Sequence, residues 1–278
     1  MKKDKMRRMC CVLLVLCLAL AAVGCGGEDA PQSYEYTESE TVAVTETDNL
    51  QVTIENGILE EKNDKDWAVY KLQQAYANAV SFLGEDYAAA ERIRCCIYAG
   101  DGLTQMREDA LDIYFYETVE QPYTNYMIQI LAGLDAADWL REGLAAYGAD
   151  LAEESLLSSY GSVLTELDVL RNVDDEEKAE YADVSALAQL LYEAGSQEKA
   201  FELGDMLENM SQMKTAEEAA QYRGAYCIYA GSFVKYLAET KGLEEVLKVY
   251  QGEDFTAVMG KSLTAMHKAW IADTFTNE

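Results

Sequence analysis

The spacing of apolar residues changes in character at Pro122, and this change restricts the fold more than any other feature of the sequence. Before Pro122, short segments with the alternation of half-buried strands flank segments with helical spacing. After it, strand patterns vanish and only helical spacing remains. The chain therefore predicts an α+β fold, with a small N-terminal sheet and helices over residues 50–121, followed by an all-helical half over residues 122–278.

The expected elements follow from these patterns. Strands are predicted over residues 50–54, 92–98 and 111–118. Helices are predicted over residues 61–84, 103–110, 123–133, 137–148, 151–170, 177–194, 197–210, 214–240, 242–251 and 262–274. Apolar residues make up 50% of the chain and only 2 residues are Pro, which favours a packed, helix-rich domain over a disordered chain.

The first 24 residues predict a secretory signal. Residues 1–9 carry five basic side chains and one acidic side chain, and residues 10–24 are apolar or small. The sequence that ends at Cys25 resembles the lipobox of bacterial lipoproteins, although Ala22 stands where Leu is more usual. The resemblance implies a lipid on Cys25 that attaches the chain to the cell membrane, on its extracellular or periplasmic side. An ordinary signal peptide cut nearby and an uncleaved membrane anchor are the alternatives.

Charge excludes one class of partner and suggests how the chain is held. The formal net charge is −28, so the chain lacks the basic surface that nucleic-acid binding needs. Removal of residues 1–24 leaves 17 basic and 49 acidic residues, a net charge of −32. Anionic lipid surfaces repel such a chain, which therefore needs a lipid and a spacer. Residues 25–49, which contain no Lys or Arg, predict this spacer as an acidic, flexible tether.

Cysteine and histidine are too few for the usual disulfide or zinc sites. Besides Cys25, the chain after the signal has Cys95, Cys96 and Cys227, and we expect these thiols to be small buried groups without disulfides. Cys95 and Cys96 are adjacent in a predicted strand, so their side chains should point to opposite faces. The single His, His267, is predicted at the surface or at a helix end.

Residues 139–147 carry the most informative motif, W-L-R-E-G-L-A-A-Y. It resembles the W-L-x-E-G-x-A-x-Y stretch of gluzincin-type zinc peptidases, the thermolysin-like and aminopeptidase-like group also called peptidase MA-like. Residues 229–237 and the segments that follow them look like the closing helices of such domains, so the resemblance spans roughly residues 50–275. It implies a gluzincin-like fold over residues 50–278, with Glu142 at the position of the third zinc ligand.

The chain departs from that family at the residues that perform its chemistry. The family's H-E-x-x-H motif places two His on one helix face with a Glu as general base. In the best register of the upstream helix, Thr124 and Ile128 stand at the two His positions and Asn125 at the base position. Ile cannot bind zinc and Asn cannot accept a proton. We therefore expect a degenerate site with no catalytic residue, no metal ligands and no cofactor, from which zinc has been lost.

Aromatic residues at helical spacing, from Tyr222 to Tyr236, have two interpretations. They could pack in the core, or they could line a groove, because Tyr offers apolar area with a polar tip. The candidate groove residues are Trp139, Tyr147, Tyr226 and Tyr229.

The sequence leaves three functional hypotheses. The first is a membrane-anchored lipoprotein that binds a peptide, a glycan or a protein at the cell surface without cutting it. The second is a structural lipoprotein that takes part in assembling a complex. The third is an active hydrolase with an unconventional metal site that includes Glu142.

Overall fold

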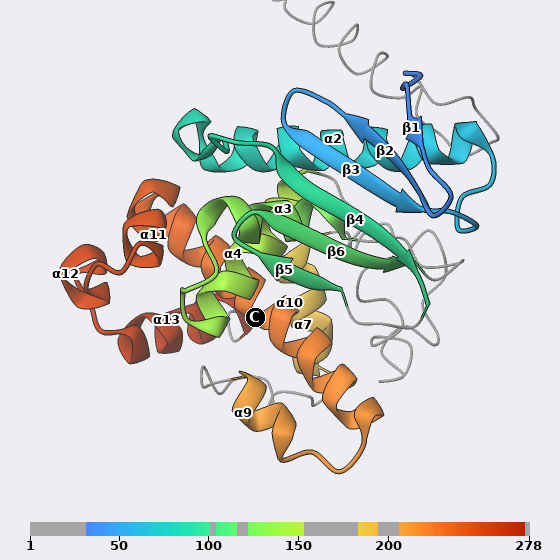
Figure 1. Ribbon diagram of the computed structural model, residues 1–278. Helices are drawn as coiled ribbons and strands as arrows, with labels where there is room; N and C mark the ends of the chain where they lie inside the picture. The colour runs from blue at the N-terminus through green and yellow to red at the C-terminus, as the bar shows by residue number, and fades with distance from the viewer. Residues whose placement is uncertain (1–31, 101–103, 116–121, 153–182, 194–205, 276–278) are drawn as a thin grey trace, which may run out of the picture.

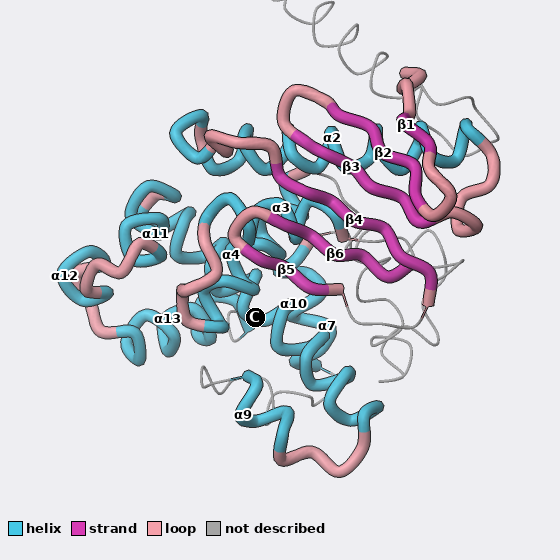
Figure 2. Tube along the Cα trace, in the orientation of Figure 1, coloured by secondary structure: helices cyan, strands magenta, loops and turns pink. Residues whose placement is uncertain are grey.

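A computed structural model describes residues 32–100, 104–115, 122–152, 183–193 and 206–275. The fold is α+β, as predicted: every described strand lies between residues 37 and 115, and every described element after Pro122 is a helix (Figures 1 and 2). No helix among these residues is long and apolar enough to cross a membrane. The predicted signal and Cys25 lie outside the described residues, as does most of the helix predicted over 151–170.

One mixed sheet contains the six described strands in the order β1-β2-β3-β4-β6-β5. β3 and β4, like β4 and β6, are parallel, whereas the pairs at both edges are antiparallel. Parallel strands need a crossover connection, which α2 supplies between β3 and β4. The strands are β1 (Thr37–Glu38), β2 (Val42–Glu46), β3 (Leu50–Glu55), β4 (Ile93–Ala99), β5 (Gln105–Arg107) and β6 (Ala110–Phe115).

The helices form the second layer and the C-terminal part of the molecule (Figure 1). A short 3-10 turn, η1 (Glu85–Tyr87), follows α2. The helices are α2 (Lys62–Leu83), α3 (Tyr123–Ala132), α4 (Asp138–Leu151), α7 (Val184–Glu193), α9 (Met206–Ser211), α10 (Ala216–Lys241), α11 (Leu243–Tyr250), α12 (Phe255–Met259) and α13 (Leu263–Phe275).

Two predictions in the N-terminal half are wrong. The predicted helix over 103–110 is instead β5 and a turn that leads into β6, so the chain pairs at the sheet edge. The predicted tether over 25–49 is wrong from Thr37 onward, because β1 and β2 belong to the sheet. In β2 the small residues Ala43 and Thr45 are buried and Val42 and Val44 are half-buried, so the segment is a half-buried strand in spite of its acidic composition.

The two faces of the sheet differ in burial. Leu50, Val52 and Ile54 of β3 are completely buried, as is Cys95 of β4, and they form the inner face that packs on the helices. Residues between them point the other way, and Cys96 is half-buried, which confirms that the two thiols lie on opposite faces. We call this second side the outer face. It carries Gln51, Thr53, Glu55, Cys96, Tyr98, Gln105, Asp112 and Tyr114.

Small residues allow α4 and α10 to pack closely. A Cβ placed on Gly143 would lie 2.5 Å from the carbonyl oxygen of Ala230, and one on Gly231 would lie 2.9 Å from Cβ of Ala146. The two backbones therefore approach to a distance that larger side chains would prevent. This helix pair positions the polar side chains of the candidate site.

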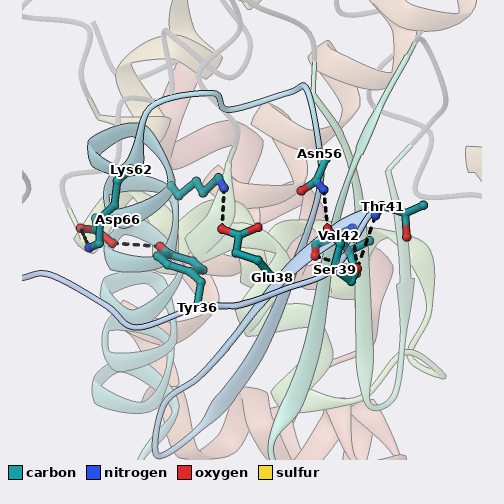
Figure 3. A network of polar contacts seen from close by, with 9 residues as sticks. Tyr36, Glu38, Ser39, Thr41, Val42, Asn56, Lys62 and Asp66 are labelled. Atoms are coloured by element: carbon teal, nitrogen blue, oxygen red, sulfur yellow. Dashed lines mark hydrogen bonds and ion pairs between the residues drawn. The ribbon is translucent and has the colours of Figure 1, made fainter.

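The N-terminal segment is fastened to α2 through Asp66 (Figure 3). This carboxylate is 5% exposed and accepts hydrogen bonds from the Tyr34 amide at 3.1 Å and the Tyr36 hydroxyl at 3.0 Å. Lys62 donates to its other oxygen at 2.7 Å. Burial opposes ionisation of Asp66, but these three hydrogen bonds outweigh it and lower the pKa of the carboxyl group.

Asp66→Ala is expected to release this segment. The substitution leaves the Tyr34 amide and the Tyr36 hydroxyl without their acceptor, so we expect a loss of about 1–3 kcal/mol in the free energy of unfolding. Faster proteolysis between residues 33 and 38, read by mass spectrometry, should accompany it. Asp64→Ala on the exposed side of the same helix is the control. Equal proteolysis of the two variants would contradict the fastening role of Asp66.

Candidate functional site

A cluster of buried polar side chains lies where α3, α4 and α10 meet. Asn125 and Gln129 are one helical turn apart on α3, and Glu142 is on α4. Their exposed fractions are 4%, 1% and 4%, although polar side chains of this kind are mostly exposed in folded proteins. Such burial is tolerated only where the groups find partners, so their hydrogen bonds define the site.

The amide of Gln129 connects the two helices. Its Nε2 donates to Asn125 Oδ1 at 2.8 Å and to Glu142 Oε2 at 3.4 Å. The thiol of Cys227, on α10, donates to the same Glu142 oxygen at 3.6 Å. Gln129 Oε1 is buried and accepts no hydrogen bond from any described residue. Two amides, one carboxylate and one thiol therefore form the amide–carboxylate cluster, defined as Asn125, Gln129, Glu142 and Cys227.

Arg141 supplies positive charge to the second oxygen of Glu142. Its Nη2 lies 3.7 Å from Glu142 Oε1 and 2.6 Å from Asp138 Oδ1. Its Nη1 donates to the Leu134 carbonyl oxygen at 3.4 Å, which holds the guanidinium at the start of α4. A buried carboxylate needs such a partner, because an uncompensated charge in the interior is strongly destabilising.

Two buried tyrosines beside the cluster keep their protons. Burial raises the pKa of Tyr226 above its ordinary value, and the negative charges of Asp138 and Glu142 raise it further. Burial also raises the pKa of Tyr250, whose hydroxyl donates to the Gly133 carbonyl oxygen at 2.6 Å. Neither phenol is disposed to act as a base near neutral pH, because its ionised form is disfavoured.

On α3, the side chain that hydrogen-bonds Glu142 is Gln129, one residue after Ile128 of the predicted register. Asn125 bonds Gln129 in turn. Ile128 instead packs toward α4 at Gly148, where an added Cβ would lie 2.4 Å from Ile128 Cδ1. Residues 125–129, N-Y-M-I-Q, thus have two amides at the i, i+4 spacing that H-E-x-x-H gives its two His.

The residues of the amide–carboxylate cluster do not fit the three-ligand zinc site of gluzincins. Catalytic zinc sites use His nitrogens together with a carboxylate or a thiolate. Here the Gln129 group that faces Glu142 is an N–H donor, which cannot coordinate a cation. Nor do the described residues contain any group of three or more His, Cys, Asp or Glu side chains arranged to hold a metal ion.

The candidate groove aromatics are mostly core residues. Trp139, Tyr226 and Tyr229 are 7%, 1% and 2% exposed, and the Trp139 ring lies 5.5 Å from that of Phe233. Of the two interpretations, this burial favours core packing for these three residues. Tyr147 is half-buried and makes an edge contact with Phe82 at 5.6 Å.

His267 is not the surface residue that the sequence predicted. It is half-buried, with its ring 5.5 Å from that of Phe233 and 5.3 Å from that of Trp270. Burial lowers the pKa of His267, so the neutral form predominates at pH 7. It belongs to the aromatic core between α10 and α13, away from the amide–carboxylate cluster.

Sequence reasoning identified Glu142 and Asn125 but missed Gln129 and Cys227. The signal for Gln129 was present, since two amides at i and i+4 in an otherwise apolar helix predict a shared buried face. Cys227 had no local signal, because only the packing of α10 on α4 brings it to Glu142. Comparisons with protein-family models, characterised proteins and solved structures give no match for this chain.

Proposed function

We propose that the protein is an exported lipoprotein, anchored to the cell membrane through Cys25, whose zinc-peptidase-like domain binds a ligand without catalysis. The observation that carries this proposal is the hydrogen bond from Gln129 Nε2 to Glu142 Oε2 at 3.4 Å. If the domain is zinc-peptidase-like, an amide donor stands at the position of an imidazole, and this bond supports a carboxylate that is held by hydrogen bonds and not by a metal.

In this function, α4 and α10 are a retained scaffold. A hydrolase needs a group that accepts a proton and a group that stabilises developing charge. In the amide–carboxylate cluster the amides cannot accept a proton, and Glu142 is already engaged by Gln129, Cys227 and Arg141. The lipid anchor and the strongly acidic surface fit a protein that works at the outer side of a membrane and is held off that membrane.

Restoring two histidines tests both the scaffold and its register. In the variant Asn125→His with Gln129→His, two imidazoles would face Glu142 at the spacing of a zinc site. We expect the full chain, in detergent and supplied with zinc, to bind far less than one equivalent, and the double variant to bind about one. Metal content by mass spectrometry after dialysis is the measurement.

The controls use the same helices. Thr124→His with Ile128→His introduces the same two imidazoles one residue earlier on α3, so we expect this variant to bind no additional zinc. Glu142→Ala in the double-His background should remove the bound ion. One equivalent of zinc on the unaltered chain, together with chelator-sensitive cleavage of a peptide library, would overturn the proposed function.

A further inference from the structure

The outer face of the sheet carries a pair of half-exposed tyrosines. Tyr98 of β4 and Tyr114 of β6 are partners in register, so their side chains leave the same face of neighbouring strands. Their ring centroids are 5.5 Å apart with an angle of 34° between the planes. Both residues are only half-buried, and together they form a tilted aromatic platform on a sheet whose other face is the core.

Polar side chains surround this platform. Glu55 follows Ile54, the register partner of Ile97, and therefore lies beside Tyr98. The next row across the sheet, two residues back along the strands, holds Thr53, Cys96, Asp112 and Gln105. Such a row lies about 7 Å from the tyrosine row, because each strand residue advances about 3.3 Å.

Asp112 is the unusual member of this row. The residue is 9% exposed, and its Oδ2 is paired with Arg107 of the edge strand β5. Its other oxygen, Oδ1, is buried and accepts no hydrogen bond from a described residue. A buried carboxylate oxygen without a donor is costly, and a ligand hydroxyl would relieve that cost.

We infer that the outer face binds a neutral glycan, with one sugar ring on the Tyr98–Tyr114 platform and its hydroxyls along the polar row that contains Asp112. Sugar rings present C–H groups on their faces and hydroxyls at their edges. The C–H groups suit an aromatic face, and the hydroxyls suit planar polar side chains. This inference rests on the proposed function, because it names the ligand class of a binding domain.

Charge and chemistry favour a neutral glycan over other ligands. A chain with a net charge of −28 disfavours anionic polymers. A hydrogen bond with Cys96 and burial raise the pKa of Tyr98 to about 12, so the platform carries no charge near neutral pH on this ring. The rows around the tyrosines hold two carboxylates, one hydroxyl and one amide, on Glu55, Asp112, Thr53 and Gln105, and these match hydroxyl groups better than apolar peptide side chains.

Calorimetric titration of the full chain tests the inference. The protein is kept in a zwitterionic detergent without a sugar headgroup, and the probes are tetrasaccharides of N-acetylglucosamine and of glucose. We expect saturable binding of at least one probe. Tyr98→Ala and Tyr114→Ala should each weaken it about tenfold or more, because each removes half of the platform. Tyr98→Phe should retain affinity, since it keeps the ring.

Tyr70→Ala is the matched control. It removes a half-buried tyrosine of α2, whose ring contacts Trp67 at 5.5 Å, and it should leave the affinity unchanged. Urea midpoints of all variants separate lost binding from lost folding. Absence of binding to both tetrasaccharides, or equal binding by the two alanine variants and the unaltered chain, would overturn the glycan site.

The test distinguishes the two proposals. Zinc content measured on the same preparations reports on the amide–carboxylate cluster, and Tyr98→Ala should not change it. Zinc binding with peptide cleavage would overturn the proposed function whatever the sugars do. Saturable binding of a neutral peptide in place of either sugar would overturn only the ligand class and leave a non-catalytic binding domain standing.

Discussion

Gly143→Ala is expected to lower the free energy of unfolding by about 2–3 kcal/mol. The added methyl carbon would lie 2.5 Å from the backbone oxygen of Ala230 and 2.6 Å from Cγ2 of Val234. Since a backbone oxygen cannot rotate away, α4 and α10 must separate, and the contacts around Glu142 separate with them. The strain outweighs the gain of about 1 kcal/mol that alanine brings to a helix interior.

Gly148→Ala is the matched control on the same helix. Its added carbon would meet Ile128 Cδ1 at 2.4 Å and the Phe82 ring at 2.6 Å, and these are side-chain atoms that can move. We expect a loss of at most about 1 kcal/mol. Urea unfolding followed by far-UV circular dichroism measures both variants. A Gly143→Ala protein as stable as the Gly148→Ala protein would show that the two helices are not in close backbone contact.

Lys235→Met is expected to cost about 2–4 kcal/mol at pH 7, because it leaves two carboxylates without their cation. Lys235, on α10, is paired with Asp183 at the start of α7 and lies 3.8 Å from Asp150 of α4. The Asp150 side chain is 9% exposed, whereas that of Asp183 is 44% exposed. Solvent therefore screens the charge of Asp183, and most of the lost free energy of unfolding should arise from Asp150.

The pH dependence of this loss identifies its source. Burial and the nearby charge of Asp183 raise the pKa of Asp150 to about 6 in the folded protein. A raised folded pKa means that the contribution of Asp150 to stability is fully present below its unfolded pKa and is lost as pH rises through about 6. The destabilisation by Lys235→Met should therefore shrink as pH falls through this range.

Two further variants provide the controls for Lys235. Lys235→Arg keeps the positive charge and should retain most of the stability at pH 7. Asp150→Asn in the Lys235→Met background removes the unpaired carboxylate and should restore stability, with little remaining pH dependence between pH 5 and 7. Unfolding free energies that fall in parallel at every pH would contradict a role for Asp150.

The sequence predicted elements that have strong periodicity and missed those that depend on tertiary context. The long apolar repeats of α2 and α10 are visible in the sequence, because burial of one stripe determines both the helix and its face. β1 and β2 were assigned to a tether, since their acidic, Thr-rich composition outweighed the alternation of Val42 and Val44. β5 is three residues long, too short for a periodic signal.

In the candidate site, the sequence alone does not determine which side chains of α3 face Glu142. Each residue turns a helix by about 100°, so a shift of one residue changes which side chains of α3 face Glu142. Choosing between Thr124 and Asn125 required knowing how α3 rotates against α4, and the Ile128–Gly148 contact fixes that rotation. The resemblance directed attention to Glu142, but the partners of Glu142 on α3 and α10 depend on packing that a linear motif does not record.

The fastening of the N-terminal segment also determines how the fold would respond to mechanical load. A pull on the N-terminus first reaches the hydrogen bonds that Asp66 accepts from Tyr34 and Tyr36, and then β1, a two-residue strand at the sheet edge. These contacts would break one after another before the load reaches β3, β4 and β6. The N-terminal edge of the sheet would therefore unfold first under tension, while the core of the domain stays folded.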